Sequence, residues 1–237
     1  ELPDAPFGDH RATNVLSVEG IDNPQQIQAP WIFTDPNERD EARRYKMIFN
    51  SRGLRLAHSA DGIRWTLTPL PDGREQLFRY HSDTMNHVLW NESIGKWVLY
   101  MRPPMFAAGV HENPGRRHYR RRTGIALSDD LVNWSVPRMV LYPDELDTND
   151  IDGTHVWRLR DQYIGFITWL YHEEGGANDV GLAVSRDGFH WEKPIPRQIW
   201  LARGRPGTFD AGCAMVGGDP PKTDGNNGKD ARDALRE

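Results

Sequence analysis

Short apolar runs, interrupted by Gly, Asp and Pro, recur along most of the chain. Runs this short, rich in aromatic and β-branched residues, predict β-strands joined by tight turns. The runs come in three groups of three, with first strands at 29–33, 87–90 and 155–159, second strands at 45–49, 97–101 and 163–169, and third strands at 53–58, 124–127 and 180–184.

Each group ends on the same motif. Ser59 to Trp65, Ser128 to Trp134 and Ser185 to Trp191 share the pattern S-x-D-[GL]-x-x-W. The copies lie about 60 residues apart, which is typical of an array of like units. We expect the Asp to form a hairpin turn by bonding the backbone ahead of it, and the Trp to pack between neighbouring units.

After each Trp we expect a fourth short strand, ending near Pro69, Pro137 or Pro194. A repeated unit of four short strands is a propeller blade. The prediction is therefore an all-β propeller domain over residues 1–216. Its blades cover about 22–76, 77–143 and 144–201, and the start of a fourth covers 202–216. Residues 217–237 are polar and rich in Gly, Asp and Asn, which predicts a flexible tail.

Composition excludes several classes of protein. The net charge is −5, which does not favour a nucleic-acid partner. No apolar run approaches the roughly 18 residues that a membrane span needs. The single Cys213 excludes an internal disulfide framework and a cysteine zinc cluster. No nucleotide-binding glycine motif is present, so no cofactor is expected.

Two charged runs each leave two interpretations open. Arg116–Arg122 is either a solvated loop or a site for an anionic group such as a uronate, sulfate or phosphate. Asp144, Glu145, Asp147, Asp150 and Asp152 form either a solvated acidic loop or oxygen ligands for Ca²⁺. The solvated loop is favoured in both cases.

Carboxylates stand near the starts of successive first strands. Counting back eight positions from the turn that follows each strand gives Ile27, Asp83 and Gly153. With one residue of slip allowed, the candidates are Gln26 or Gln28, Asp83 and Asp152, and the next unit offers Asp210. Because first strands line the channel of a propeller, we expect these side chains to converge at one mouth. Carboxylates meeting there suit acid/base chemistry on a glycosidic bond.

At this point the sequence resembles the five-bladed β-propeller glycoside hydrolases, which include the arabinanase/xylosidase and invertase families. The segment Arg43-Arg44-Tyr45-Lys46-Met47, followed by Ser59 to Trp65, is most similar to uncharacterised bacterial members. The resemblance covers roughly residues 22–216 and implies a five-bladed propeller of which this chain holds part. It also favours a secreted or periplasmic location.

The resemblance implies three acids: a nucleophile or base in the first blade, a stabilising Asp in the second and an acid in the third. Asp83 matches the second position, and Asp152 falls near the third, where Glu is usual. The first position departs from the pattern, because Gln26-Ile27-Gln28 has no carboxylate. Candidate substrate contacts are His81, Asn86, Arg102, His155 and Gln28.

Two functions follow as alternatives. The first is a glycosidase that cleaves a carbohydrate, with Asp83 and Asp152 as the preferred carboxylates and Asp210 as the third. The second is a non-catalytic propeller that binds carbohydrate or protein. In either case, unpaired strand edges at the ends of the array predict self-association of the isolated chain.

Overall fold

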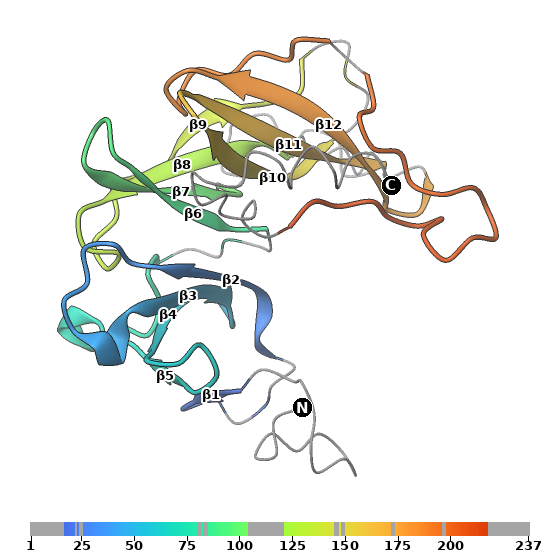
Figure 1. The fold of residues 1–237 in the computed structure, drawn as a ribbon. Helices are drawn as coiled ribbons and strands as arrows, with labels where there is room; N and C mark the ends of the chain where they lie inside the picture. The colour runs from blue at the N-terminus through green and yellow to red at the C-terminus, as the bar shows by residue number, and fades with distance from the viewer. Residues whose placement is uncertain are drawn as a thin grey trace, which may run out of the picture.

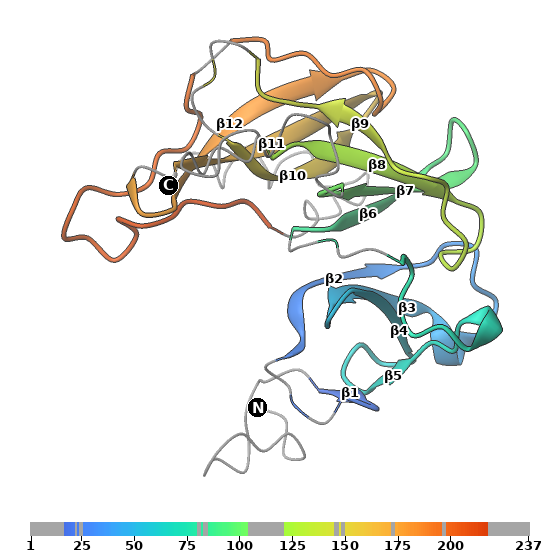
Figure 2. The same cartoon turned by 180° about the vertical axis from the view of Figure 1, so that it is seen from behind.

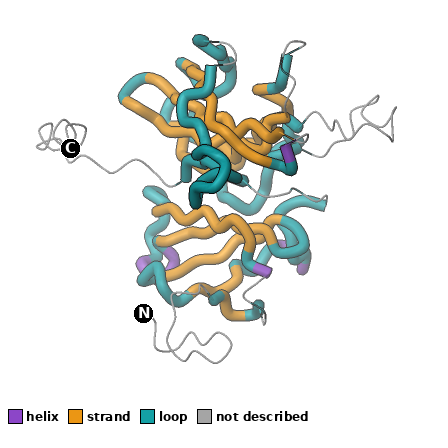
Figure 3. Tube along the Cα trace, turned by 90° about the vertical axis from the view of Figure 1, so that its right-hand side faces the viewer, coloured by secondary structure: helices purple, strands orange, loops and turns teal. Residues whose placement is uncertain are grey.

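The computed structural model describes residues 17–21, 23, 26–79, 82, 85–103, 121–144, 147, 150–171, 174–195 and 198–217. Within these ranges the regular structure is almost entirely strand, and helix is limited to short turns such as Glu41–Arg43 and Pro71–Gly73 (Figure 3). The predicted all-β class is confirmed.

The strands form three antiparallel sheets that follow one another along the chain (Figure 1). Their orders are β1-β5-β4-β3-β2, β6-β7-β8-β9 and β10-β11-β12, with β1 joined to β5 in parallel. The strands are β1 (Val18–Glu19), β2 (Gln28–Thr34), β3 (Tyr45–Asn50), β4 (Leu54–Ser59), β5 (Trp65–Leu67), β6 (His87–Asn91), β7 (Lys96–Met101), β8 (Thr123–Ser128), β9 (Arg138–Leu141), β10 (Asp150–Leu159), β11 (Gln162–Tyr171) and β12 (Ala177–Ser185).

The sheets stack face to face as the blades of a propeller, with the first strands β2, β6 and β10 on the inner side (Figures 1 and 2). One buried cluster joins the first and second sheets through side chains such as Trp31, Leu56 and Trp97. Another joins the second and third through Tyr100, Val156 and their neighbours. Burial of these apolar faces supplies the main stabilisation between blades.

The three repeated motifs fold into the same hairpin. In each copy the Ser hydroxyl and two backbone N–H groups donate to one oxygen of the Asp. The residue before the Trp binds the other oxygen through its side chain, and the Trp indole N–H donates to the carbonyl three residues earlier. The predicted turn role of the Asp agrees with this geometry.

The second hairpin differs from the others in having Leu131 at the glycine position. Leu131 adopts φ 66°, a left-handed backbone that disfavours a side chain. Its side chain is 1% exposed in the core between the first two blades. Burial of the leucine offsets the backbone cost at this position.

The motif tryptophans follow the prediction in two of three copies. Trp134 packs between the first and second blades, and Trp191 packs against Tyr100 between the second and third. Trp65 instead lies on the other face of the first blade, in a buried cluster with Val18 and Phe49. That face has no preceding sheet in the described chain, and Val18 of the edge strand β1, with Ile21 and Ile27, packs into the cluster there.

The outer strands differ from the prediction in two blades. In the second blade, β9 begins directly after Pro137 rather than ending near it, because proline has no N–H to add to the ladder. In the third blade, the described residues of the outer segment make isolated bridges, at Glu192 and Leu201, and no regular strand. Beyond it, Cys213 forms a parallel bridge with Asn178 on β12.

The exact blade boundaries and the fourth-blade start at 202–216 stay predictions, and residues 218–237 lie outside the described part. Self-association also stays a prediction. Exposed apolar side chains gather near the outer part of the third blade, where Ile195 is 62% and Trp200 54% exposed. None of the helices in the described part is long and apolar enough to cross a membrane.

The hairpin geometry predicts a measurable loss on changing Asp130. We expect Asp130→Ala to lower the free energy of unfolding by about 1–2 kcal/mol, because two backbone N–H groups lose their acceptor. Asp129→Ala, which removes only an exposed ion pair with Lys96, is the matched control. Equal losses in urea denaturation of the two variants would contradict the turn role.

Candidate active site

The inner strands converge through three equivalent positions. Trp31, His87 and His155 each pair with the same position on the second strand of their blade. Trp31 stacks on His87 with ring centroids 4.0 Å apart, and His155 lies 5.5 Å from Trp31 and 5.9 Å from His87. Residues from the first and third blades therefore meet at the propeller axis, in what we call the axial ring layer.

The two histidines of this layer are buried and neutral. Burial lowers the pKa of His155 to about 4, and burial followed by the nearby His155 places the pKa of His87 well below its usual range. His87 Nδ1 accepts a bond of 2.9 Å from the Val156 N–H, so its proton is assigned to Nε2. This setting favours a core role for His155 over the predicted substrate contact.

Acid should therefore destabilise the fold before most carboxylates titrate. The folded state holds the pKa of His155 near 4, so the unfolded chain takes up its proton first as the pH falls. Neutral His155 makes its full contribution to the free energy of unfolding above about pH 6.5, and this contribution falls by about 3 kcal/mol by pH 4. Urea denaturation at several pH values should show this loss, and His155→Phe should make the slope shallower while His87 keeps its own part of it. An unchanged slope in His155→Phe would contradict the prediction.

Asp152 lies near the start of the third inner strand, β10, and precedes His155 of the axial ring layer on that strand. A register shift between Ile151 and Gly153 leaves Asp152 as an extra residue in β10. Such bulges re-aim a side chain. Two arginines from the second blade bind its carboxylate: Arg102 Nη2 donates to Oδ1 at 2.6 Å, and Arg121 Nη1 donates to the same oxygen.

The surrounding backbone is closely packed. Arg102 also donates to the Asp152 carbonyl at 2.8 Å, and the Ile151 N–H donates to the Arg121 carbonyl at 3.1 Å. Gly153 lies so near Met85 that a Cβ at this position would overlap the Met85 side chain. The start of β10 is thus fixed against the segment that leads into β6.

The structure places the other predicted residues differently. Asp83 and His81 lie outside the described residues, so their roles stay predictions. Asn86 is buried and accepts from the Ser82 hydroxyl at 2.9 Å. Gln28 is exposed at the start of β2, opposite Asn50. Asp210 Oδ1 accepts from the Thr208 hydroxyl at 2.6 Å within a turn, and its catalytic role stays a prediction.

The acidic run offers little for a cation. Asp144 and Asp147 both bind the Lys193 ammonium, which already supplies a positive charge between them. Among the described residues, no group of three or more His, Cys, Asp or Glu side chains is arranged to hold a metal ion. Glu145 and Arg116–Arg120 lie outside the described residues, so the Ca²⁺ and anion interpretations stay untested.

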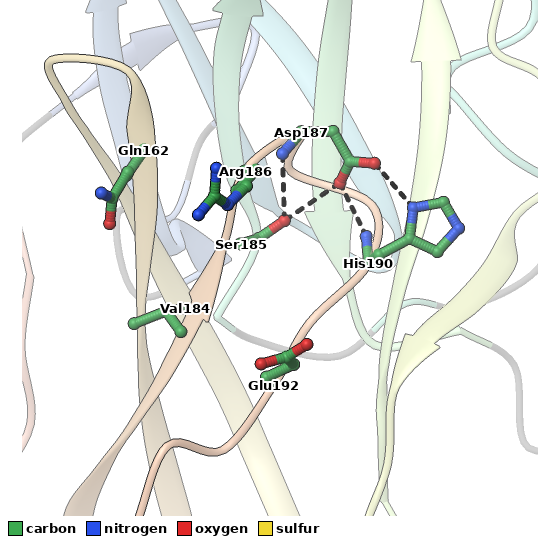
Figure 4. Close-up of a pocket in the computed structure, with 7 residues that line it drawn as sticks. All are labelled: Gln162, Val184, Ser185, Arg186, Asp187, His190 and Glu192. Carbon is green, nitrogen blue, oxygen red and sulfur yellow. Dashed lines mark hydrogen bonds and ion pairs between the residues drawn. The ribbon is translucent and has the colours of Figure 1, made fainter.

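A surface pocket at the third hairpin carries a Ser, an Asp and a His, but it is not a catalytic triad. Figure 4 shows that Ser185 and His190 both bind Asp187 and that the Ser hydroxyl points to the Asp rather than to the His. In the other two hairpins the His position is held by Arg64 and Asn133. The set therefore forms a turn, at the end of the blade away from Asp152.

Sequence reasoning missed Arg121, Ser82 and Trp31 as parts of this region. Arg121 was visible only as one residue of a basic run, and its pairing with Asp152 depends on how β8 and β10 approach each other. Trp31 is an apolar residue in an apolar strand. Its place on the axis could have been found by aligning it with His87 and His155.

No family model matches the chain, and no curated protein matches it. Among solved structures, a glycoside hydrolase superposes with a TM-score of 0.53 and 17% identity, covering 76% of this chain and 55% of that protein. An endo-1,4-beta-xylanase from Bacteroides thetaiotaomicron superposes with a TM-score of 0.52 and 14% identity, covering 75% of this chain and 56% of that protein.

The fold is that of the five-bladed β-propeller glycoside hydrolases. The resemblance predicted from the repeated hairpins is thereby confirmed for the fold. At these identities the likeness shows architecture alone. The chain spans a little over half the length of these two structures.

Proposed function

We propose that this propeller acts on the glycosidic bond of a carbohydrate at the axial end where Asp152 lies. The observation that carries the proposal is the ion-paired Asp152 carboxylate at the start of an inner strand, where side chains of three blades converge. The resemblance to the propeller glycoside hydrolases implies acids near the starts of inner strands, and two structural neighbours are named as a glycoside hydrolase and an endo-1,4-beta-xylanase.

The ion pair favours a particular role for Asp152. Two guanidinium groups stabilise a charged carboxylate, and a general acid must instead carry a proton. A charged carboxylate suits stabilisation of the positive charge that develops on the sugar ring, or acceptance of a proton from water. We therefore assign Asp152 to charge stabilisation or base chemistry, and leave the acid to Asp83 or to a residue outside the described part.

A non-catalytic carbohydrate-binding propeller is the second candidate. It is favoured by the lack of a carboxylate at the start of β2, where Gln28 occupies the position at which the resemblance implies a catalytic acid. A narrower choice of substrate, an anionic sugar, rests on the basic run Arg116–Arg122 in the sequence.

A panel of neutral and acidic polysaccharides separates these candidates. The enzyme proposal expects release of reducing ends from at least one member, and calorimetric binding to the same member. Binding with no release would select the binding module. Neither binding nor release across the panel would contradict both.

A further inference from the structure

Ser82 lies at a junction of hydrogen bonds just before the second inner strand. It is 1% exposed, and its single hydroxyl proton is shared between two acceptors, the Arg102 carbonyl at 3.1 Å and Asn86 Oδ1 at 2.9 Å. Asn50 Nδ2 on the first blade donates to the Ser82 carbonyl at 3.0 Å. Ser82 is therefore bonded at both its main chain and its side chain.

The bonds continue from Arg102 to the candidate site. The Arg102 main chain is held by Ser82, while its guanidinium donates to the Asp152 carboxylate at 2.6 Å and to the Asp152 carbonyl at 2.8 Å. A connected path thus runs from Asn50 in the first blade, through Ser82 and Arg102 in the second, to Asp152 in the third.

The path follows the repeat of the fold. Asn50 and Arg102 are each two residues beyond equivalent positions, Ile48 and Tyr100, which pair with Trp31 and His87. Each reaches to the start of the next inner strand, Asn50 to Ser82 and Arg102 to Asp152. These hydrogen bonds join the first blade to the second and the second blade to the third, and Ser82 connects them by bonding both Asn50 and Arg102.

We propose that Ser82 is a positioning residue that fixes Arg102 and, through it, the Asp152 carboxylate. The Arg102 side chain is 6% exposed and donates to both the carbonyl and the carboxylate of Asp152, so a shift of the Arg102 main chain moves the donors that Asp152 binds. Loss of the Ser82 hydroxyl removes the donor that holds this main chain in place. The effect on turnover rests on the proposed function, but the effect on the Asp152 carboxylate does not.

Cys213 offers a readout that needs no substrate. It is the chain's single cysteine and is exposed. Although the residue is exposed overall, loss of hydration around its thiol, and after it the negative charge of Asp152, raises the pKa of the thiol. Moving the Asp152 carboxylate should therefore change how fast iodoacetamide alkylates the thiol as a function of pH.

The experiment compares alkylation of the wild type, Ser82→Ala, Asp152→Asn and Ser128→Ala. Ser128 is the matched control, since it is an equally buried serine of the same blade whose hydroxyl serves the hairpin. We expect Asp152→Asn to raise the alkylation rate near pH 8 about twofold. Ser82→Ala should shift the pH profile in the same direction, and Ser128→Ala should leave it unchanged despite a comparable loss of melting temperature.

A double-mutant cycle supplies the second arm. If Ser82 acts through Arg102, the double variant Ser82→Ala/Asp152→Asn should lose less free energy of unfolding than the sum of the losses of the two single variants. Restoration of the wild-type alkylation profile by Ser82→Thr would support the role of the hydroxyl. A folded Ser82→Ala with a wild-type profile, or additive losses in the cycle, would overturn the proposal. Turnover that never appears in the wild type would count against the proposed function alone.

Discussion

Asp152→Asn is expected to lower the free energy of unfolding by about 3–5 kcal/mol, more than most single substitutions. The Asp152 and Arg102 side chains are 13% and 6% exposed, so the pair is largely removed from water. Asp152→Asn takes away the negative charge with which Arg102 and Arg121 are both paired, and breaking a buried ion pair is costly. Urea denaturation at pH 7 measures the loss.

The control is Asp129→Asn, which removes a carboxylate that is 75% exposed and paired with Lys96. Exposed pairs contribute between zero and about 1 kcal/mol. A loss below about 1 kcal/mol in Asp152→Asn, equal to that of the control, would show that the carboxylate is solvated and that the arginines do not depend on it.

Trp31→Ala is expected to cost about 3–5 kcal/mol, through loss of the central aromatic contact of the axial ring layer. Trp31 is 5% exposed, stacks on His87, and donates from its indole N–H to the Val88 carbonyl at 3.0 Å. It therefore ties the first blade to the second through both packing and a hydrogen bond. Chemical denaturation followed by tryptophan fluorescence measures the loss.

Ile32→Ala is the matched control for this second variant. Ile32 follows Trp31 on the same strand, points to the opposite face and is 42% exposed. We expect a loss below about 1 kcal/mol from it, because little apolar area is removed from the core. Similar losses for the two variants would contradict the placement of Trp31 at the axis.

The repeat carried most of what could be predicted about the fold. The S-x-D-[GL]-x-x-W hairpins place their own turn, because each Asp binds local backbone groups that need no partner from elsewhere. The strands before each hairpin were also predictable, because their short apolar runs are a local feature of the sequence. Outer strands were less predictable, since β9 and the bridge at Leu201 depend on which edge atoms a neighbouring segment can reach.

The place of Asp152 near the start of the third inner strand was predictable, but its hydrogen-bond partners were not. Counting back from the turns located Asp152, which the structure places at a bulge of the third inner strand. Its arginine partners could not be read in the same way, because Arg102 and Arg121 lie 50 and 31 residues away along the chain. The burial of His155 could not be predicted from its own strand either, because Trp31, which lies against it, comes from another blade.

Turnover by Asp152→Asn tests the central claim most directly, namely that the ion-paired carboxylate at the axis acts on a glycosidic bond. The best substrate from the polysaccharide panel is assayed with the wild type, Asp152→Asn and Asp129→Asn, at a temperature where denaturation curves show all three folded. We predict release by the wild type and Asp129→Asn, and a rate about 10²–10⁴-fold lower in Asp152→Asn. Release by Asp152→Asn at the wild-type rate would contradict the account.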